Sequence, residues 1–349
     1  MLAIHVNWTA PSISRRQPGD AIVDPLEILT SITTALFWKR SGGTIELYTD
    51  AAGQRFYEEA GLADAYDRID TRTLDSFTRR SDINPAQTPC VGRMQVLASL
   101  SRPFVAMDLD LAFFGAGDFP YTASDLCCLH WELPMPPSYP TPDAQFMPEG
   151  FALPSGLDFL SLVPNIAFLY VGRPDFFRPY ADLASDYVRR ASEQNGSLPT
   201  PSRAAAAPEA GLPTNVPTIF ADQRLLGMLA AQQGLRVETL WNEIFTCAPF
   251  GDRWEVLARN AAADASAHGL VSPYWVLDPR RFDGRKQTVD CVHLWFEKSL
   301  YPVPGRHYRR RQAVIERIAQ RLASAFPDNP IAARVLARLP RPHQDTSFA

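Results

Sequence analysis

The sequence has no long hydrophobic run, and no stretch approaches the roughly 20 consecutive apolar residues with which a helix crosses a membrane. Its first eight residues also lack a basic segment followed by an apolar core, which is the pattern of a secretory signal. We therefore expect no transmembrane segment and a cytoplasmic location.

Charge of one sign is not in excess. The 34 Lys and Arg residues and the 38 Asp and Glu residues leave a formal net charge of -4 at pH 7. A chain with this balance has no global attraction to nucleic acid or to an anionic membrane. We expect no nucleic-acid partner, and any phosphate-binding patch must be local.

Cysteine is scarce. The five cysteines are an odd number, and no two of them form a Cys-x-x-Cys pair. These spacings argue against a disulfide framework and against a structural zinc site. The adjacent Cys127 and Cys128 lie in an apolar stretch, which indicates small buried side chains. The chain also contains no internal repeat.

What is present is an ordinary globular composition, 46% hydrophobic and 21% charged over 349 residues. Short β-branched or aromatic runs predict strands, and apolar residues at helical spacing predict helices. Their alternation along the first third of the chain indicates an α/β fold with a parallel sheet. In that third we expect strands at 3–8, 44–48 and 104–107, with helices at 25–39, 51–62 and 91–100.

The later part of the chain is less regular. Residues 133–145 contain five prolines and predict a loop across a surface or over a site. Residues 191–218, with five prolines, six alanines and no aromatic residue, predict a flexible insertion. We expect strands at 126–129, 159–163, 166–171, 237–240 and 289–296, with helices at 176–190 and 225–234.

These segments predict one α/β domain over residues 1–300. A basic, helical C-terminal extension follows over residues 301–349, broken at Pro327 and Pro330. We expect the insertion at 191–218 to belong to the α/β domain, because it is too short to form a domain of its own.

The stretch around which the chain is organised is the apolar run Phe104 to Met107, followed by Asp108-Leu109-Asp110. In an open α/β sheet, ligands bind beyond the carboxyl ends of the strands. Two carboxylates placed there repel each other and need a cation or a proton. The motif indicates a divalent-metal site for a phosphorylated ligand, although a strand followed by an Asp-rich turn has the same sequence.

Six segments carry a resemblance to a known family. They are Ile45 to Asp50 with Gly53, Gly92 to Leu97, Asp108 to Asp110, Asn165 to Tyr170, Asp222-Gln223, and His293 with Lys298. In this order, over about residues 3 to 300, the chain resembles metal-dependent nucleotide-sugar glycosyltransferases of the A-type fold. The nearest members are glycogenin-like and small bacterial Asp-x-Asp transferases. Two departures are Ala167 in place of a glycine and the residues Leu294 to Glu297 between the late histidine and lysine.

The resemblance implies a single Rossmann-like domain with a mixed, mostly parallel sheet. It also implies transfer of a sugar from a nucleoside-diphosphate sugar, with UDP as the nucleotide, to an unknown acceptor. The implied cofactor is Mn²⁺ or Mg²⁺, held by Asp108, Asp110 and His293. The implied donor contacts are Trp8, which would stack on the base, Asp50, Arg93, Asp108 and Lys298. Asp222 and Asn165 are the implied catalytic residues, with Asp222 on the acceptor side.

Simpler structural roles also fit these residues. Asp50 and Asp222 each suit a helix N-cap. Trp8 suits a core position, Asn165 suits a turn after Pro164, and a histidine in an apolar strand is usually a hydrogen-bonded core residue.

Two other functions share the motif. A phosphatase of the haloacid-dehalogenase type also places Asp-x-Asp after an apolar strand, and Asp108 would then be the nucleophile. A non-catalytic nucleotide-sugar-binding module could keep the same fold and aspartates without turnover.

Overall fold

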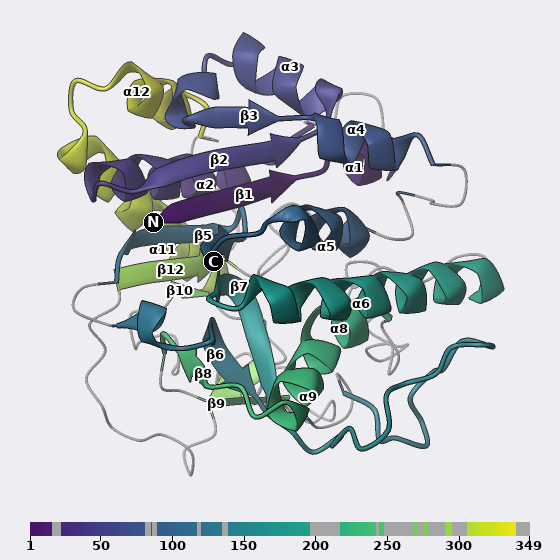
Figure 1. The fold of residues 1–349 in the computed structure, drawn as a ribbon. Helices are drawn as coiled ribbons and strands as arrows, with labels where there is room; N and C mark the ends of the chain where they lie inside the picture. Colours follow the sequence, from purple (N-terminus) through teal and green to yellow (C-terminus); the bar gives the residue numbers. More distant parts are fainter. Residues whose placement is uncertain are drawn as a thin grey trace.

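A computed structural model describes residues 1–15, 22–80, 85, 89–116, 120–134, 139–195, 217–241, 244–247, 269–270, 275–277, 290–294 and 306–339. These residues form an α/β fold with a large mixed sheet, a small second sheet and helices on both sides of the large sheet (Figure 1). The predicted fold class is confirmed. Within the described part of the chain, no helix is both long and apolar enough to span a membrane.

The large sheet has nine strands in the described residues. They are β1 (Leu2–Asn7), β2 (Thr44–Thr49), β3 (Arg68–Asp70), β4 (Phe104–Met107), β6 (Leu126–Glu132), β7 (Val163–Val171), β8 (Val237–Thr239), β9 (Ile244–Cys247) and β11 (Trp275–Leu277). Their order is β11-β9-β6-β7-β4-β1-β2-β3, and β8 also pairs with β6. Neighbours are parallel except where β7 meets β4 and β6 and where β11 meets β9, so the sheet is mixed and mostly parallel.

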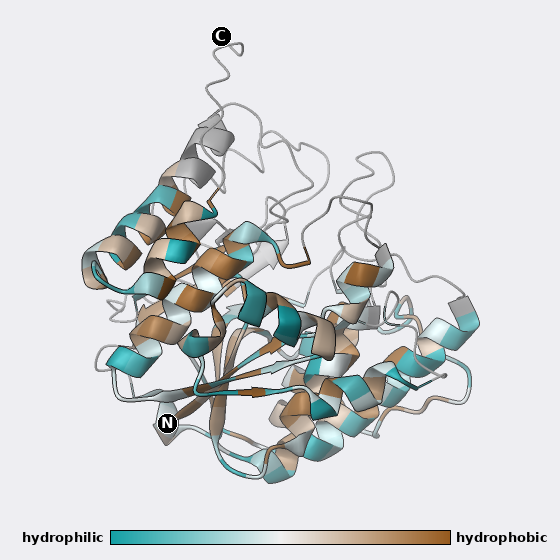
Figure 2. Cartoon of the chain, turned by 90° about the horizontal axis from the view of Figure 1, so that it is seen from above, coloured by the Kyte–Doolittle hydropathy of each residue, from teal (hydrophilic) through white to brown (hydrophobic). Residues whose placement is uncertain are grey.

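Both faces of this sheet are buried. Successive residues of a strand point to opposite sides, so each strand contributes to an apolar cluster on each face. In β1, Ala3 joins one apolar cluster, whereas Leu2 and Ile4 join the other. Figure 2 shows the resulting arrangement, with hydrophobic strands in the middle and helices of mixed hydropathy around them. The first cluster includes residues of α2 (Pro25–Arg40), α11 (Arg306–Ala325) and α12 (Pro330–Ala337); the second includes residues of α4 (Arg72–Thr78), α5 (Pro89–Ser99), α6 (Pro174–Asn195) and α9 (Leu225–Gln232).

Shorter helical pieces complete the described chain: α1 (Ala10–Arg15), α3 (Ala51–Glu59), η1 (Ala63–Ala65), η2 (Tyr121–Ala123), α8 (Pro217–Ile219) and the π-helical turn η3 (Phe220–Arg224). The pieces α8, η3 and α9 follow one another without a break. This continuous segment packs against β7 and α6, with Phe220 and Leu225 buried in the second cluster.

The small sheet has the order β10 (Gly269–Leu270), β12 (Asp290–Leu294) and β5 (Leu111–Gly115) in the described residues. β5 begins directly after the Asp-x-Asp motif. β12 runs antiparallel to β5 and places His293 opposite Leu111. Two segments about 180 residues apart in the sequence are therefore joined at the motif.

Two expectations about the middle of the chain are wrong. In place of two strands, the single strand β7 runs through Pro164 and Asn165, and residues 159–162 lie outside it. Proline has no N–H to donate to a neighbouring strand, so it suits a position that is paired on one side only. Pro164 is such a position, because it is in register with Trp131 on β6, while the pairing of β7 with β4 starts only at Phe168. Residues 191–195 belong to α6 and not to an insertion, since the fully buried Ala191 continues its apolar side. At the other end of that expected insertion, residues 217–218 belong to α8, and 196–216 lie outside the described residues.

The described part of the C-terminal tail, residues 306–339, is mainly helical, as predicted. Its helices α11 and α12 pack against α2, and Ile318, Leu322 and Ile331 are buried in the first apolar cluster. The tail therefore shares a core with the sheet. A division of the chain at residue 300 stays a prediction, because 295–305 lie outside the described residues.

Candidate metal and donor site

Three parallel strands end at one edge of the large sheet. β1 pairs with β4 as far as His5 opposite Met107, and with β2 as far as Asn7 opposite Thr49. Asp108 follows Met107 directly. Its carboxylate is therefore delivered to the edge at which sheets of this kind bind ligands, as predicted.

Hydrogen bonds from three elements hold the turn that carries the two aspartates. The Asp108 N–H donates to a carbonyl of β7 over 2.8 Å, and the Leu294 N–H of β12 donates to the Asp110 carbonyl over 2.9 Å. From α2, the Thr30 hydroxyl donates to the carbonyl of Leu109. The backbone of the motif is thus fixed on three sides, which sets where the carboxylates can lie.

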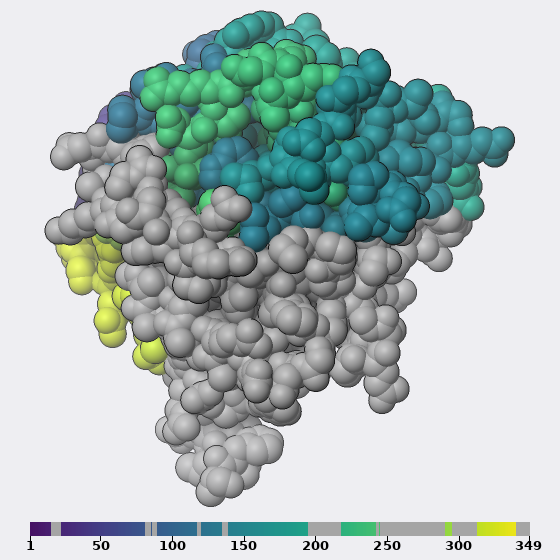
Figure 3. Space-filling view, turned by 90° about the horizontal axis from the view of Figure 1, so that it is seen from below, coloured from purple at the N-terminus to yellow at the C-terminus, as the bar shows by residue number. Residues whose placement is uncertain are grey.

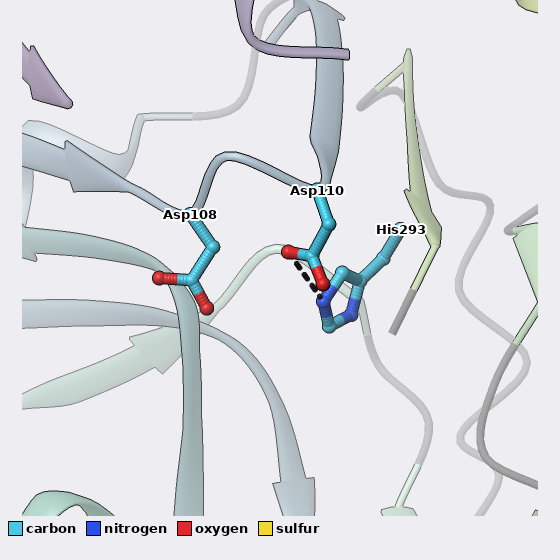
Figure 4. A group of neighbouring side chains, drawn as sticks. All are labelled: Asp108, Asp110 and His293. Atoms are coloured by element: carbon cyan, nitrogen blue, oxygen red, sulfur yellow. Dashed lines mark ion pairs between the residues drawn. The ribbon is translucent and has the colours of Figure 1, made fainter. Parts of the chain in front are cut away.

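The structure brings the three predicted metal ligands together. Asp108, Asp110 and His293 each offer one ligand atom, and these three atoms lie within 4.8 Å of one another. Figure 4 shows the His293 ring beside Asp110, with Nε2 3.4 Å from Oδ1. The His293 side chain is only 2% exposed, whereas Asp108 keeps 36% of its side chain exposed. The cluster therefore opens to solvent on the Asp108 side.

This donor set fits a divalent cation. Two carboxylates supply the hard oxygen ligands that Mg²⁺ and Mn²⁺ prefer, and an imidazole nitrogen favours Mn²⁺. The carboxylates of Asp108 and Asp110 also repel each other unless positive charge lies nearby. Three protein ligands do not complete an octahedral shell, so oxygens of water or phosphate are needed as well.

Arg93 on α5 lies against this cluster. Its Nη1 is 2.9 Å from Asp108 Oδ1, and its Nη2 donates to the Ile166 carbonyl over 2.7 Å. Burial lowers the pKa of Arg93, but the charges of Asp108 and Asp222 outweigh this and raise the pKa above its ordinary value. Arg93 is therefore a fixed positive charge at the site.

Asp222 is close enough to Arg93 and Asp108 to interact with both charges. Burial raises the pKa of Asp222 to about 6, with Arg93 lowering it and Asp108 raising it. Asp222 lies inside η3, and neither η3 nor α9 has a side-chain cap. The N-cap alternative for Asp222 is wrong, because helical backbone precedes it. Its role towards an acceptor stays a prediction.

Asn165 lies inside β7, so the alternative of a turn after Pro164 is also wrong. Its Nδ2 donates to Glu132 Oε1 over 3.0 Å, and its Oδ1 accepts from the Ala167 N–H over 3.2 Å. Both ends of the amide are thus used inside the protein, and the residue is 1% exposed. A direct contact of Asn165 with a sugar stays a prediction.

Asp50 has the structural role of a helix N-cap, which was the alternative to a contact with the donor. It is the N-cap of α3, and its carboxylate accepts hydrogen bonds from the Thr9 hydroxyl and from the N–H groups of Ala10 and Gly53. It is 5% exposed. These contacts join the ends of β1 and β2, and a contact between Asp50 and a donor stays a prediction.

Trp8 lies in the core next to α5. Its indole N–H donates to Thr78 Oγ1 over 2.7 Å, and its ring meets Phe77 edge to face. A Cβ atom at Gly92 would lie 2.6 Å from Trp8 Cε3, so this glycine lets α5 approach the ring closely. The contact helps to place Arg93, the next residue. Stacking of Trp8 on a base stays a prediction.

Lys298 lies outside the described residues, and its donor contact stays a prediction.

The sequence assigned no role to Glu132 or to its partner Tyr139, although both are fully or almost fully buried close to Asn165 and Gln223. One indication was available. Apart from His130, the residues that precede Glu132 in its strand are apolar, and a carboxylate buried there needs hydrogen-bond donors around it.

No protein-family model matches this chain, and no curated protein matches it. Among solved structures, a galactosyltransferase, LgtC, in complex with donor and acceptor sugar analogs is 10% identical, with 98% of each chain covered and a TM-score of 0.41. Mouse xyloside xylosyltransferase 1 is 11% identical, covering 69% of this chain and 85% of that one, with a TM-score of 0.31. A nucleoside-diphosphate-sugar pyrophosphorylase from Vibrio cholerae RC9 is 10% identical, covering 68% and 91%, with a TM-score of 0.32.

These neighbours are glycosyltransferases and a nucleotide-sugar enzyme. Identities near 10% and TM-scores below 0.5 say nothing about the activity of this chain. Its chemistry has to be inferred from the side chains of the site.

Proposed function

We propose that this protein is a metal-dependent glycosyltransferase of the hexosyltransferase type. It would move a sugar from a nucleoside-diphosphate sugar, with UDP as the nucleotide, to a saccharide, protein or small-molecule acceptor. One observation carries the proposal: ligand atoms of Asp108, Asp110 and His293 converge within 4.8 Å beyond the carboxyl end of a parallel strand. A diphosphate bridged to the protein by a divalent cation is the ligand that this donor set and this edge of the sheet fit best.

Asp108, Asp110 and His293 would hold Mn²⁺ or Mg²⁺, which when bound stabilises the negative charge of a departing nucleoside diphosphate. Arg93 supplies a second, covalently fixed positive charge. Its bond to the Ile166 carbonyl keeps the guanidinium in place, so no reorientation is needed when phosphate charge develops. Lys298 would add a third positive charge on the diphosphate side.

Asp222 would act on the acceptor side. Above a pH of about 6 its carboxylate is ionised and can accept a hydrogen bond, or a proton, from an acceptor hydroxyl. Asn165 would contribute through the buried Glu132, which it holds by a hydrogen bond.

The test is isothermal titration of UDP with and without Mn²⁺. We expect Mn²⁺-dependent binding to the wild type and none to an Asp108→Ala/Asp110→Ala double variant. A Glu58→Ala/Glu59→Ala variant is the matched control, because it removes two negative charges from exposed positions on α3. If the folded wild type binds no nucleoside diphosphate in Mn²⁺, the proposal is wrong.

The alternatives give different results. A phosphatase with Asp108 as nucleophile would hydrolyse p-nitrophenyl phosphate, which has no nucleoside. A non-catalytic module would bind UDP-sugars and show neither transfer nor hydrolysis of them. Hydrolysis of a UDP-sugar that requires Mn²⁺ and both aspartates would support the transferase.

A further inference from the structure

A buried hydrogen-bond network lies beside the candidate site and links β6, β7, the proline-rich loop and η3. Its centre is Glu132, the last residue of β6, whose side chain has no exposed surface. Glu132 Oε1 accepts from Asn165 Nδ2 over 3.0 Å and lies 3.3 Å from His130 Nε2. The other oxygen, Oε2, is hydrogen-bonded to the hydroxyl of Tyr139.

The backbone fixes which end of the Asn165 amide faces Glu132. The Ala167 N–H donates to Asn165 Oδ1 over 3.2 Å, so the other end of that amide, the Nδ2 donor, faces Glu132. Oε1 is therefore an acceptor whatever the charge of the carboxyl group. A proton on Oε1 would face His130 Nε2 over 3.3 Å, whereas a proton on Oε2 faces the Tyr139 hydroxyl, and it is this second form that couples Glu132 to Tyr139.

The Tyr139 hydroxyl makes a second contact, 3.0 Å from Oε1 of Gln223. A hydroxyl has one proton and cannot donate it to both neighbours. When Glu132 is protonated on Oε2, that oxygen donates to Tyr139, and Tyr139 donates to Gln223 Oε1. When Glu132 is ionised, Tyr139 donates to Glu132, and Gln223 keeps its contact only by turning its amide so that Nε2 donates to the hydroxyl oxygen.

The two states present different ends of the Gln223 amide to their surroundings. Gln223 is partly exposed and follows Asp222 in η3. Figure 3 shows the segment of η3 and α9, in green, beside the teal segment that follows the proline-rich loop. When Glu132 is protonated on Oε2, the end of Gln223 that faces away from Tyr139 is the N–H₂ donor. When Glu132 is ionised, that end is the carbonyl acceptor.

We propose that Glu132 is a positioning residue, which through the Tyr139 hydroxyl selects whether Gln223 presents a donor or an acceptor beside Asp222. The use of this choice between donor and acceptor in sugar recognition rests on the proposed function. A ligand hydroxyl that donates would select one state, and a ligand oxygen that accepts would select the other. The coupling between Glu132 and Gln223 itself requires no ligand.

The surroundings allow both states near neutral pH. Burial raises the pKa of Glu132 to about 7, against the hydrogen bonds from Tyr139 and Asn165 and the charge of His293, which lower it. His130 on the same strand and Cys128 also face this carboxyl group, and burial keeps the Cys128 thiol neutral by raising its pKa. Asp222 is the other acid near Gln223 that titrates in this range.

The experiment follows the side-chain N–H₂ signals of Gln223 by ¹⁵N NMR on the full chain, assigned by their loss in Gln223→Glu. In the wild type these signals should shift between pH 5 and pH 8.5. In Glu132→Gln they should stay at the low-pH position throughout, because the glutamine N–H₂ replaces the protonated Oε2 as donor. In Tyr139→Phe, which keeps the ring but removes the link, the shift should be lost.

Glu132→Gln and Tyr139→Phe are measured in an Asp222→Asn background, which removes the neighbouring acid, and Asp222→Asn alone should keep the shift. The proposal is overturned if the shift persists in Glu132→Gln or Tyr139→Phe, or if it disappears in Asp222→Asn. Since the readout uses neither metal nor nucleotide, failure to bind UDP would reject the proposed function without affecting this result.

Discussion

Arg93 Nη1 lies 2.9 Å from Asp108 Oδ1, while Nη2 of the same guanidinium donates to the Ile166 carbonyl of β7. One side chain from α5 thus joins the first aspartate of the motif to the neighbouring antiparallel strand. The guanidinium neutralises Asp108, and it would share that carboxylate with a bound cation. In the proposed function, Arg93 would therefore affect the binding of metal and the binding of diphosphate in opposite directions.

Replacing Arg93 by Gln is expected to raise the affinity of the free protein for Mn²⁺ and to lower its affinity for UDP in saturating Mn²⁺. Because Asp108 is 36% exposed, the ion pair is screened, and we expect a gain for Mn²⁺ of no more than about fivefold. Electron paramagnetic resonance of free Mn²⁺ and titration of UDP measure the two effects. Arg102→Gln, at a 67% exposed side chain, is the control. A weaker affinity for Mn²⁺ in Arg93→Gln would contradict the assignment.

Asp110→Asn and His293→Ala should separate the two candidate metals. Loss of an outer-shell partner typically costs metal affinity about 10- to 100-fold, and loss of a ligand should cost no less. Asp110→Asn should weaken Mn²⁺ and Mg²⁺ alike. His293→Ala should weaken Mn²⁺ more than Mg²⁺, because Mg²⁺ prefers oxygen ligands. Competition between the two ions in titration measures the difference, and equal losses in both variants would argue against His293 as a ligand.

Two adjacent threonines of α2 provide a matched test of how the motif is supported. Thr34 donates to the Leu111 carbonyl over 2.7 Å and accepts from the Phe113 N–H over 2.8 Å, whereas Thr33 Oγ1 has no hydrogen-bond partner among the described residues. Both are fully buried. Thr34→Val should lower the free energy of unfolding by about 1–3 kcal/mol, because it leaves β5 groups unpaired. Thr33→Val should be neutral or stabilising in urea unfolding, and a larger loss there would contradict this account.

Glu132 should make stability depend on pH. Burial raises its pKa from 4.5 to about 7 on folding, so the native state binds a proton that the unfolded chain releases. The contribution is fully present below pH 4.5 and is lost as the pH rises through about 7, for a total of roughly 3 kcal/mol. Urea unfolding of wild type and Glu132→Gln from pH 4.5 to 8 should show the wild type losing stability relative to the variant. Parallel pH profiles for the two proteins would be the contrary result.

The comparison cancels other buried groups. His5, whose pKa burial lowers to about 3, makes stability fall as the pH drops below 6.5, and Asp222 acts in the same direction as Glu132. Both are present in wild type and variant. The difference between the two profiles therefore reports Glu132 alone.

The regular part of the fold could be predicted from residue patterns. The strands β1, β2 and β4 and the helices α2, α3 and α5 lie where apolar spacing places them, since both faces of a parallel sheet must be covered. The same reasoning failed at Pro164. A proline reads as a break, and only the neighbouring strands reveal that β7 passes through it where the β4 side is not yet paired.

The sequence by itself determined that Asp108 and Asp110 lie at the end of a buried strand, because local hydrophobicity sets the strand and its end. That His293 belongs beside them came from resemblance, and its placement was decided by tertiary structure, through the pairing of β12 with β5. The contacts of Arg93 with Asp108 and of Glu132 with Tyr139 and Gln223 were also decided there. Each joins residues from different elements, and their charge and hydrogen bonding depend on burial, which no local pattern encodes.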